Sequence, residues 1–213
     1  MADIEVIEGN RHVKAYPYPP GKVPARWVPG DVILTHSQHG LFGQLIRFGE
    51  ALRYRSKDDK PYAWFNHAAV VISQDPGTGE PRVAEALGSG IQKSPASKYS
   101  PEWFAYIDVD ARQGDRHQIV QFAEREAEVH EPYGFLQIAT IAVSLLAGGR
   151  LTVGMDGSEI CSALAAKALR GAGYWWERGG QIVDETYLTP ADLAAGFHTE
   201  KIRTEPVLAS ATA

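Results

Sequence analysis

The chain has 213 residues, of which 44% are hydrophobic and 22% charged, a composition typical of globular proteins that excludes the disordered class. Its single cysteine, Cys161, excludes an intrachain disulfide and multi-cysteine zinc sites. The formal net charge of -5 argues against binding of nucleic acid through phosphate contacts, so we expect no nucleic-acid partner.

The first 29 residues are rich in proline and tyrosine. We interpret residues 1–29 as an irregular arm that lies over the domain, not as a separate fold. The opening residues, MADIEVIEGN, are acidic where an export signal is basic, so we expect no signal peptide. The expected location is therefore the cytoplasm, or delivery by another route such as association with a virion.

From Gly30 onward, short apolar runs alternate with turn signals. The predicted strands are Val32–Leu34, His67–Ser73, Pro81–Ala86 and Trp103–Val109. A helix is predicted over Gly40–Tyr54, from the spacing of its apolar residues. Strands of this length separated by turns predict an antiparallel sheet or a small barrel.

The second half of the chain is predicted to be helical. Its expected helices cover Gln118–Val129, a segment starting at Pro132, a segment from a Ser158 cap to Gly171, and a segment capped by Thr189 with Pro190 in its first turn. Strands first and helices afterwards predict an α+β fold. We expect one domain over residues 30–200, followed by a tail over residues 201–213.

The most apolar stretch is Phe135–Ala147. It is too short for an ordinary membrane span and contains polar residues, so we favour a buried helix and expect no stable membrane insertion. Trp175 and Trp176 could line a substrate cleft, but core packing is the favoured interpretation.

Cys161 lies in the first turn of the helix that Ser158 is predicted to cap. Free backbone amides and the positive end of the helix dipole stabilise a thiolate at such a position, and a thiolate is a competent nucleophile. The alternative is a buried, inert cysteine on the apolar side of the helix.

Two further residues could complete a nucleophilic site. His67 begins an apolar strand, where it is either the base for Cys161 or a core histidine bonded to a backbone carbonyl. Glu85 lies inside the next short apolar strand, where a charge is costly unless it is paired. If the two strands are neighbours, Glu85 can orient the His67 ring; otherwise it faces outward.

No pattern predicts a metal ion or a cofactor. His36 and His39 have no third ligand at a standard spacing, which favours a solvated turn. The segment Gly88–Gly90 is too short for a phosphate-binding loop and is expected to be a turn.

Six segments, taken in order, are similar to those of a known family. They are GDVILTH (Gly30–His36), NHAAVVIS (Asn66–Ser73), VAEALGSGIQ (Val83–Gln92), EPYGF (Glu131–Phe135), EICSALAAKAL around Cys161, and LTPADLAAG (Leu188–Gly196). Together they resemble the circularly permuted NlpC-type cysteine peptidases, a papain-like family, and within it the YiiX-like bacterial subgroup. The order is the permuted one, because the histidine precedes the cysteine.

The resemblance implies a role for each matching residue. Cys161 matches the nucleophile, His67 the base and Glu85 the third, polar position, while Tyr133 and Ser162 fall where substrate or the oxyanion is bound. Asp31 matches a recurrent Gly-Asp before the first strand, with an expected structural role. The implied activity is cleavage of an amide through a thioester, with a peptide, cell-wall or acyl-amide substrate and no cofactor.

Two alternatives stay open at this point. One is lipid acyl transfer or thioester hydrolysis, as in a related permuted branch. The other is a non-catalytic structural or binding module on the same fold.

Overall fold

The computed structural model describes residues 4–7, 13–36, 62–87, 89–129, 161–178 and 180–197. The strands are β1 (Ile4–Ile7), β2 (Lys14–Tyr18), β3 (Val32–Thr35), β4 (His67–Gln74), β5 (Pro81–Leu87), β6 (Gly90–Pro95), β7 (Phe104–Asp108), β8 (Trp175–Arg178) and β9 (Gln181–Ile182). The helices are α2 (Gln113–Val129), α4 (Cys161–Gly171) and α5 (Pro190–Gly196), with 3-10 turns η1 (Tyr62–Trp64), η2 (Ala96–Tyr99) and η3 (Glu185–Tyr187). The fold is α+β, as predicted.

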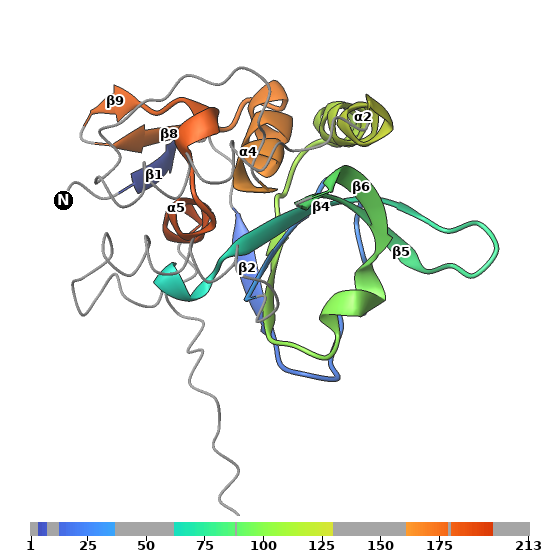
Figure 1. Ribbon diagram of the computed structural model, residues 1–213. Helices are drawn as coiled ribbons and strands as arrows, with labels where there is room; N and C mark the ends of the chain where they lie inside the picture. The colour runs from blue at the N-terminus through green and yellow to red at the C-terminus, as the bar shows by residue number, and fades with distance from the viewer. Residues whose placement is uncertain are drawn as a thin grey trace, which may run out of the picture.

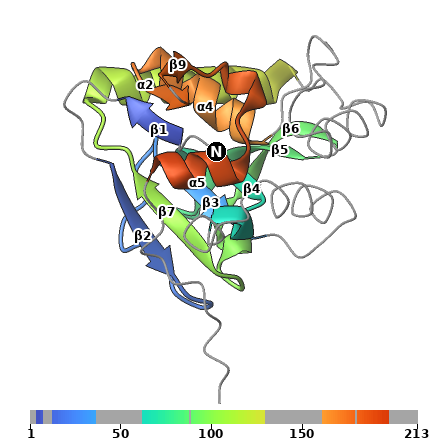
Figure 2. The same cartoon turned by 90° about the vertical axis from the view of Figure 1, so that its left-hand side faces the viewer.

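The described residues form two antiparallel sheets. The large sheet has six strands in the order β2-β7-β3-β4-β5-β6, and the small sheet has three in the order β1-β8-β9. Over the described residues β2 and β6 are free edges, so of the two predicted forms the open sheet is found and the closed barrel is not. Helices α2 and α4 and the small sheet all lie on one side of the large sheet (Figures 1 and 2).

The central strands of the large sheet are buried on both faces. Successive side chains of a strand point to opposite faces, and here each face meets a separate apolar cluster. The cluster beneath the helices includes Val32, Leu34, Ala68, Val70 and Ala84. The cluster on the opposite face includes Ile33, Ala69, Val71, Val83 and Tyr99. Burial on both faces explains why β3 and β4 have nearly continuous apolar sequences.

The expectation of an irregular arm over residues 1–29 is wrong in part. Strand β2 pairs with β7 at the edge of the large sheet, and β1 pairs with β8 in the small sheet. Proline is tolerated in an edge strand because one side of the strand needs no hydrogen bonds, and β2 contains Pro17. The proline-rich composition therefore concealed an edge strand.

Other boundaries also differ from the predictions. Strand β6 was not predicted, because an edge strand needs no apolar alternation. It begins at Gly90, inside the expected turn. Strands β8 and β9 lie in the half that was expected to be helical. Helix α2 begins at Gln113, earlier than predicted, because its first turn is polar and lacks apolar periodicity.

Several local predictions are confirmed. The hydroxyl of Thr189 accepts a hydrogen bond from the Asp192 amide, and the Asp192 carboxylate accepts one from the Thr189 amide, which forms a capping box at the start of α5. Helix α4 ends at Gly171, as expected. Trp176 is fully buried in the core, and the half-buried Trp175 packs against the guanidinium of Arg170.

Some predictions lie outside the described residues: the helix over 40–54, the Ser158 cap, the helix starting at Pro132 and the apolar run 135–147 within it. Within the part of the chain that is described, no helix combines the length and apolar character needed to cross a bilayer.

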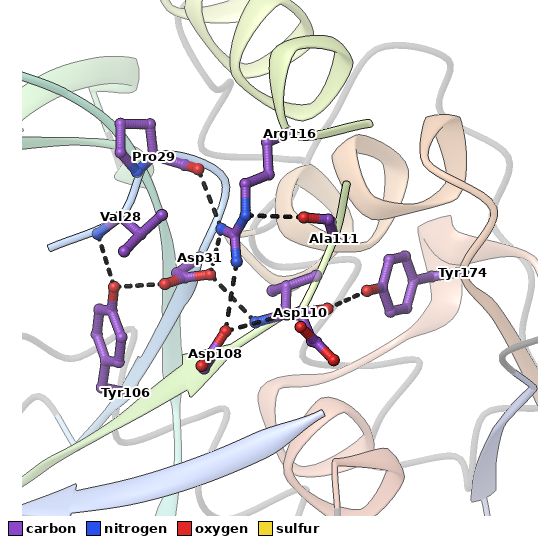
Figure 3. A network of polar contacts seen from close by, with 10 residues as sticks. Val28, Pro29, Asp31, Tyr106, Asp108, Asp110, Ala111, Arg116 and Tyr174 are labelled. Carbon is purple, nitrogen blue, oxygen red and sulfur yellow. Dashed lines mark hydrogen bonds and ion pairs between the residues drawn. The ribbon is translucent and has the colours of Figure 1, made fainter. Parts of the chain in front are cut away.

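The carboxylate of Asp31 joins the large sheet to α2 (Figure 3). It accepts hydrogen bonds from Arg116 and Tyr106, each at 2.5 Å, and from the Val109 amide at 3.1 Å. Burial raises the pKa of Asp31, and the hydrogen bonds from Tyr106 and Arg116 oppose that rise. These contacts fit the structural role expected for this residue.

Candidate active site

Cys161 is the first residue of α4 and is 5% exposed. The helix that follows is rich in alanine, which favours helix formation and lets the helix pack closely on β4 and β5. Among the described residues, the thiol is therefore at the first position of α4, against the large sheet.

His67 is the first residue of β4, opposite Thr35 on β3. The thiol of Cys161 lies near enough to this ring for its charge and hydrogen bonding to raise the pKa of His67. His67 is the first residue of β4 and Cys161 is the first described residue of α4. The two side chains therefore approach each other at these ends of the strand and the helix. The cysteine is buried, but it is in contact with a base, unlike an inert core thiol.

Glu85 lies on β5 opposite Ala69, so it shares a face of the sheet with His67, two residues away on β4. The Oε2 atom of Glu85 is 2.8 Å from Nε2 of His67. Glu85 is fully buried, so the alternative of an outward-facing side chain is wrong. Since Nε2 contacts Glu85, Nδ1 is the ring nitrogen left to face Cys161.

The electrostatics of this chain of contacts favour charged groups. Burial alone lowers the pKa of His67, but the charge and hydrogen bond of Cys161, followed by those of Glu85, outweigh it and raise that pKa to about 9. For Glu85, burial acts in the opposite direction and raises the pKa. This effect is outweighed by the hydrogen bond and charge of His67 and by hydrogen bonds from Lys98 and Ser94, so that the pKa falls to about 2. At neutral pH, His67 is therefore an imidazolium and Glu85 a carboxylate.

Sequence reasoning missed three further contacts of Glu85. The hydroxyl of Tyr99 donates to Oε2 at 2.7 Å, the ammonium of Lys98 donates to Oε1, and Ser94 forms another hydrogen bond. Lys98 and Tyr99 belong to η2, which directly follows the unpredicted strand β6. The available signal was indirect: a buried carboxylate needs several donors.

The two residues expected to bind substrate or the oxyanion have different outcomes. Ser162 is fully buried, and its hydroxyl donates to the carbonyl of Leu188 at 2.6 Å. That hydroxyl fastens α4 to the segment before α5, so a role at the oxyanion is left to the backbone amide of Ser162. Tyr133 lies outside the described residues.

The expectation that His36 lies in a solvated turn is wrong. His36 is buried, its Nδ1 is 2.7 Å from the carbonyl oxygen of Trp64, and the two rings stack with centroids 4.6 Å apart. His39 lies outside the described residues. Among the residues that are described, no group of three or more His, Cys, Asp or Glu side chains is placed to hold a metal ion.

Comparisons with protein-family models, with curated proteins and with solved structures find no match to this chain. The functional argument therefore depends on the geometry of the site.

Proposed function

We propose that the protein is a cysteine hydrolase that cleaves an amide bond, of peptide or peptidoglycan type, through a thioester acyl-enzyme. The observation that carries the proposal is the grouping of Cys161, His67 and the buried Glu85: the Cys161 thiol raises the pKa of His67, and Oε2 of Glu85 is 2.8 Å from Nε2 of His67. It supplies a nucleophile, a proton carrier and a residue that holds the carrier in position.

In the first step, the Cys161 thiolate attacks the carbonyl carbon of the amide. A carbon–sulfur bond forms while the carbonyl electron pair moves onto oxygen. Backbone amides at the start of α4 stabilise this oxyanion. The carbon–nitrogen bond then breaks, and the departing amine takes the proton from the His67 imidazolium, leaving a thioester.

In the second step, neutral His67 accepts a proton from water as the water oxygen attacks the thioester carbonyl. The carbon–sulfur bond breaks and the acid product leaves. The Cys161 thiolate and the His67 imidazolium are then restored. Glu85 keeps its charge throughout, since its hydrogen bonds to His67 and Lys98 stabilise the carboxylate.

The proposed fold class is a permuted papain-like domain. The supporting features are an open antiparallel sheet, a helix that begins with the cysteine, and a histidine that precedes this cysteine in the chain. The permuted order leaves the chemistry unchanged, because it depends on the contact between side chains and not on their order.

The test is a substrate screen with trapping of the acyl-enzyme. Labelled peptidoglycan fragments, short peptides and acyl esters are incubated with wild type, Cys161→Ala and His67→Ala. We expect amide turnover by wild type alone, with the acyl mass on the Cys161 peptide in mass spectra of quenched reactions.

Two results would revise the proposal. Turnover of acyl esters but of no amide would favour the acyltransferase or thioesterase alternative. A wild type that forms no covalent adduct with any acyl donor, and behaves like Cys161→Ala, would favour a non-catalytic module.

A further inference from the structure

The buried carboxylate of Glu85 has more partners than are needed to orient His67. Oε2 accepts from His67 at 2.8 Å and from Tyr99 at 2.7 Å, while Oε1 accepts from the ammonium of Lys98. Lys98 thus binds the oxygen that His67 does not use. The two cations contact the same carboxylate without competing for one atom.

A count of charges explains why a second cation is useful. In its reactive form the site holds two anions, the Cys161 thiolate and the Glu85 carboxylate. Without Lys98 only the His67 imidazolium would face both of them. A buried charge that is left without a partner is strongly unfavourable, so one anion would become protonated. With Lys98 present, each anion has a cation of its own.

We infer that Lys98 is a positioning residue whose ammonium balances the charge of Glu85, so that the imidazolium charge of His67 stays available to the Cys161 thiolate. This role rests on the proposed function, because it matters only where the thiolate is the reacting form. Lys98 acts through Glu85 and is not itself assigned a contact with substrate.

The surroundings of Glu85 make Lys98 the relevant charge. The groups that reach the carboxylate are His67 from β4, Ser94 from β6, and Lys98 and Tyr99 from η2. Tyr99 is neutral at physiological pH, since burial and the charge of Glu85 raise its pKa well above the ordinary value. The Lys98 ammonium also lies 5.1 Å from the centre of the Tyr99 ring, which holds it beside the carboxylate.

The test is the pH dependence of Cys161 alkylation by iodoacetamide in the 213-residue chain, which has a single cysteine. The variants are Lys98→Met, which removes the charge, and Lys98→Arg, which keeps it. The matched control is Lys93→Met, because the side chains of Lys93 and Lys98 are 34% and 33% exposed. Lys93 instead pairs with Glu124 and Glu128 on α2.

We expect Lys98→Met to raise the pH of half-maximal alkylation by about 0.5–1 unit, because removing a nearby cation disfavours the thiolate while partial exposure screens the effect. Lys98→Arg and Lys93→Met should keep the wild-type midpoint. If Lys98 only stabilised the fold, Lys98→Met would lower the melting temperature but would not change the pH of half-maximal alkylation.

The outcomes separate the inference from the proposed function. If wild-type Cys161 is activated but Lys98→Met and Lys93→Met have the same midpoint, the role of Lys98 is overturned and the hydrolase proposal stands. If wild type alkylates like a free thiol and His67→Ala changes nothing, both fail. If the midpoint depends on Lys98 but no acyl donor reacts, the inference stands and the hydrolase proposal fails.

Discussion

At the scale of single residues, the central feature is a fully buried carboxylate that stays charged. Glu85 could be predicted to need a partner, because its strand is short and apolar, and His67 on the preceding predicted strand was the expected partner. His67 was expected as the base for Cys161 because it begins an apolar strand, where its ring needs a fixed partner. Lys98 and Tyr99 could not be found in this way, because they lie in a polar segment without periodicity.

Replacing Glu85 with Gln tests this electrostatic arrangement through the pH dependence of stability. The ordinary pKa of Glu85 is 4.5, and above this pH its lowered pKa adds to the free energy of unfolding. This contribution is lost as the pH falls toward 2. The raised pKa of His67 adds stability below its ordinary value of 6.5, which is lost as the pH rises through about 9. Both contributions are complete only between these two ordinary values.

We therefore expect Glu85→Gln to lower the free energy of unfolding most between pH 4.5 and 6.5, by about 2–4 kcal/mol, and less on either side. Urea unfolding at a series of pH values measures this. Glu80→Gln is the control, since the Glu80 carboxylate accepts from Ser97 and lies outside the site. A loss that is equal at every pH would contradict the pairing.

Tyr99→Phe removes one neutral donor from the buried carboxylate while the ring stays in its apolar cluster. We expect a loss of about 1–2 kcal/mol in the free energy of unfolding, the typical effect of removing a partner from a buried acceptor. The control is Tyr16→Phe, since Tyr16 is 42% exposed. Equal unfolding midpoints for the two variants in urea would show that the Tyr99 hydroxyl contributes nothing.

At the scale of elements, predictions succeeded where one local signal determined the structure. The buried strands β3, β4 and β5 have compact apolar runs bounded by turns, and α5 has a cap and a proline in its first turn. The strands that were missed, β1, β2, β6, β8 and β9, lie at sheet edges or in the small sheet. Their pairing is determined by partners distant in sequence, which a local pattern does not reveal.

Thr189→Ala tests the capping box of α5. Loss of the hydroxyl leaves the Asp192 amide without its acceptor, so we expect a loss of about 1 kcal/mol in the free energy of unfolding. Thermal unfolding measures this loss. Thr189→Ser retains the hydroxyl and should have a melting temperature close to that of wild type. Equal melting temperatures for the Ala and Ser variants would argue that the cap is energetically neutral.

At the scale of the whole molecule, the large sheet separates two apolar clusters, and the candidate site lies where β4 and α4 begin. The α+β class and the antiparallel sheet could be predicted, because turn-separated strands precede most of the helices. The open edge and the small sheet could not, since both depend on which strands pair. The Asp31 network then ties this sheet to α2.

Arg116→Met tests that connection. It leaves the buried Asp31 without its cation, so we expect a loss of about 2–4 kcal/mol at pH 7 and a smaller loss at pH 4, where Asp31 can take up a proton. Arg125→Met, on the same helix, removes the same charge from a side chain that is 77% exposed. Similar unfolding midpoints for both variants at pH 7 would rule out a stabilising role for the network.

The central claim is that His67 activates Cys161, and it is tested most directly by the rate of iodoacetamide alkylation at pH 6. The account predicts that wild-type Cys161 reacts about tenfold or more faster than a free thiol, which is almost wholly protonated at that pH. It also predicts that His67→Ala abolishes this advantage. A wild-type rate no greater than that of a free thiol, or a rate unchanged in His67→Ala, would contradict the account.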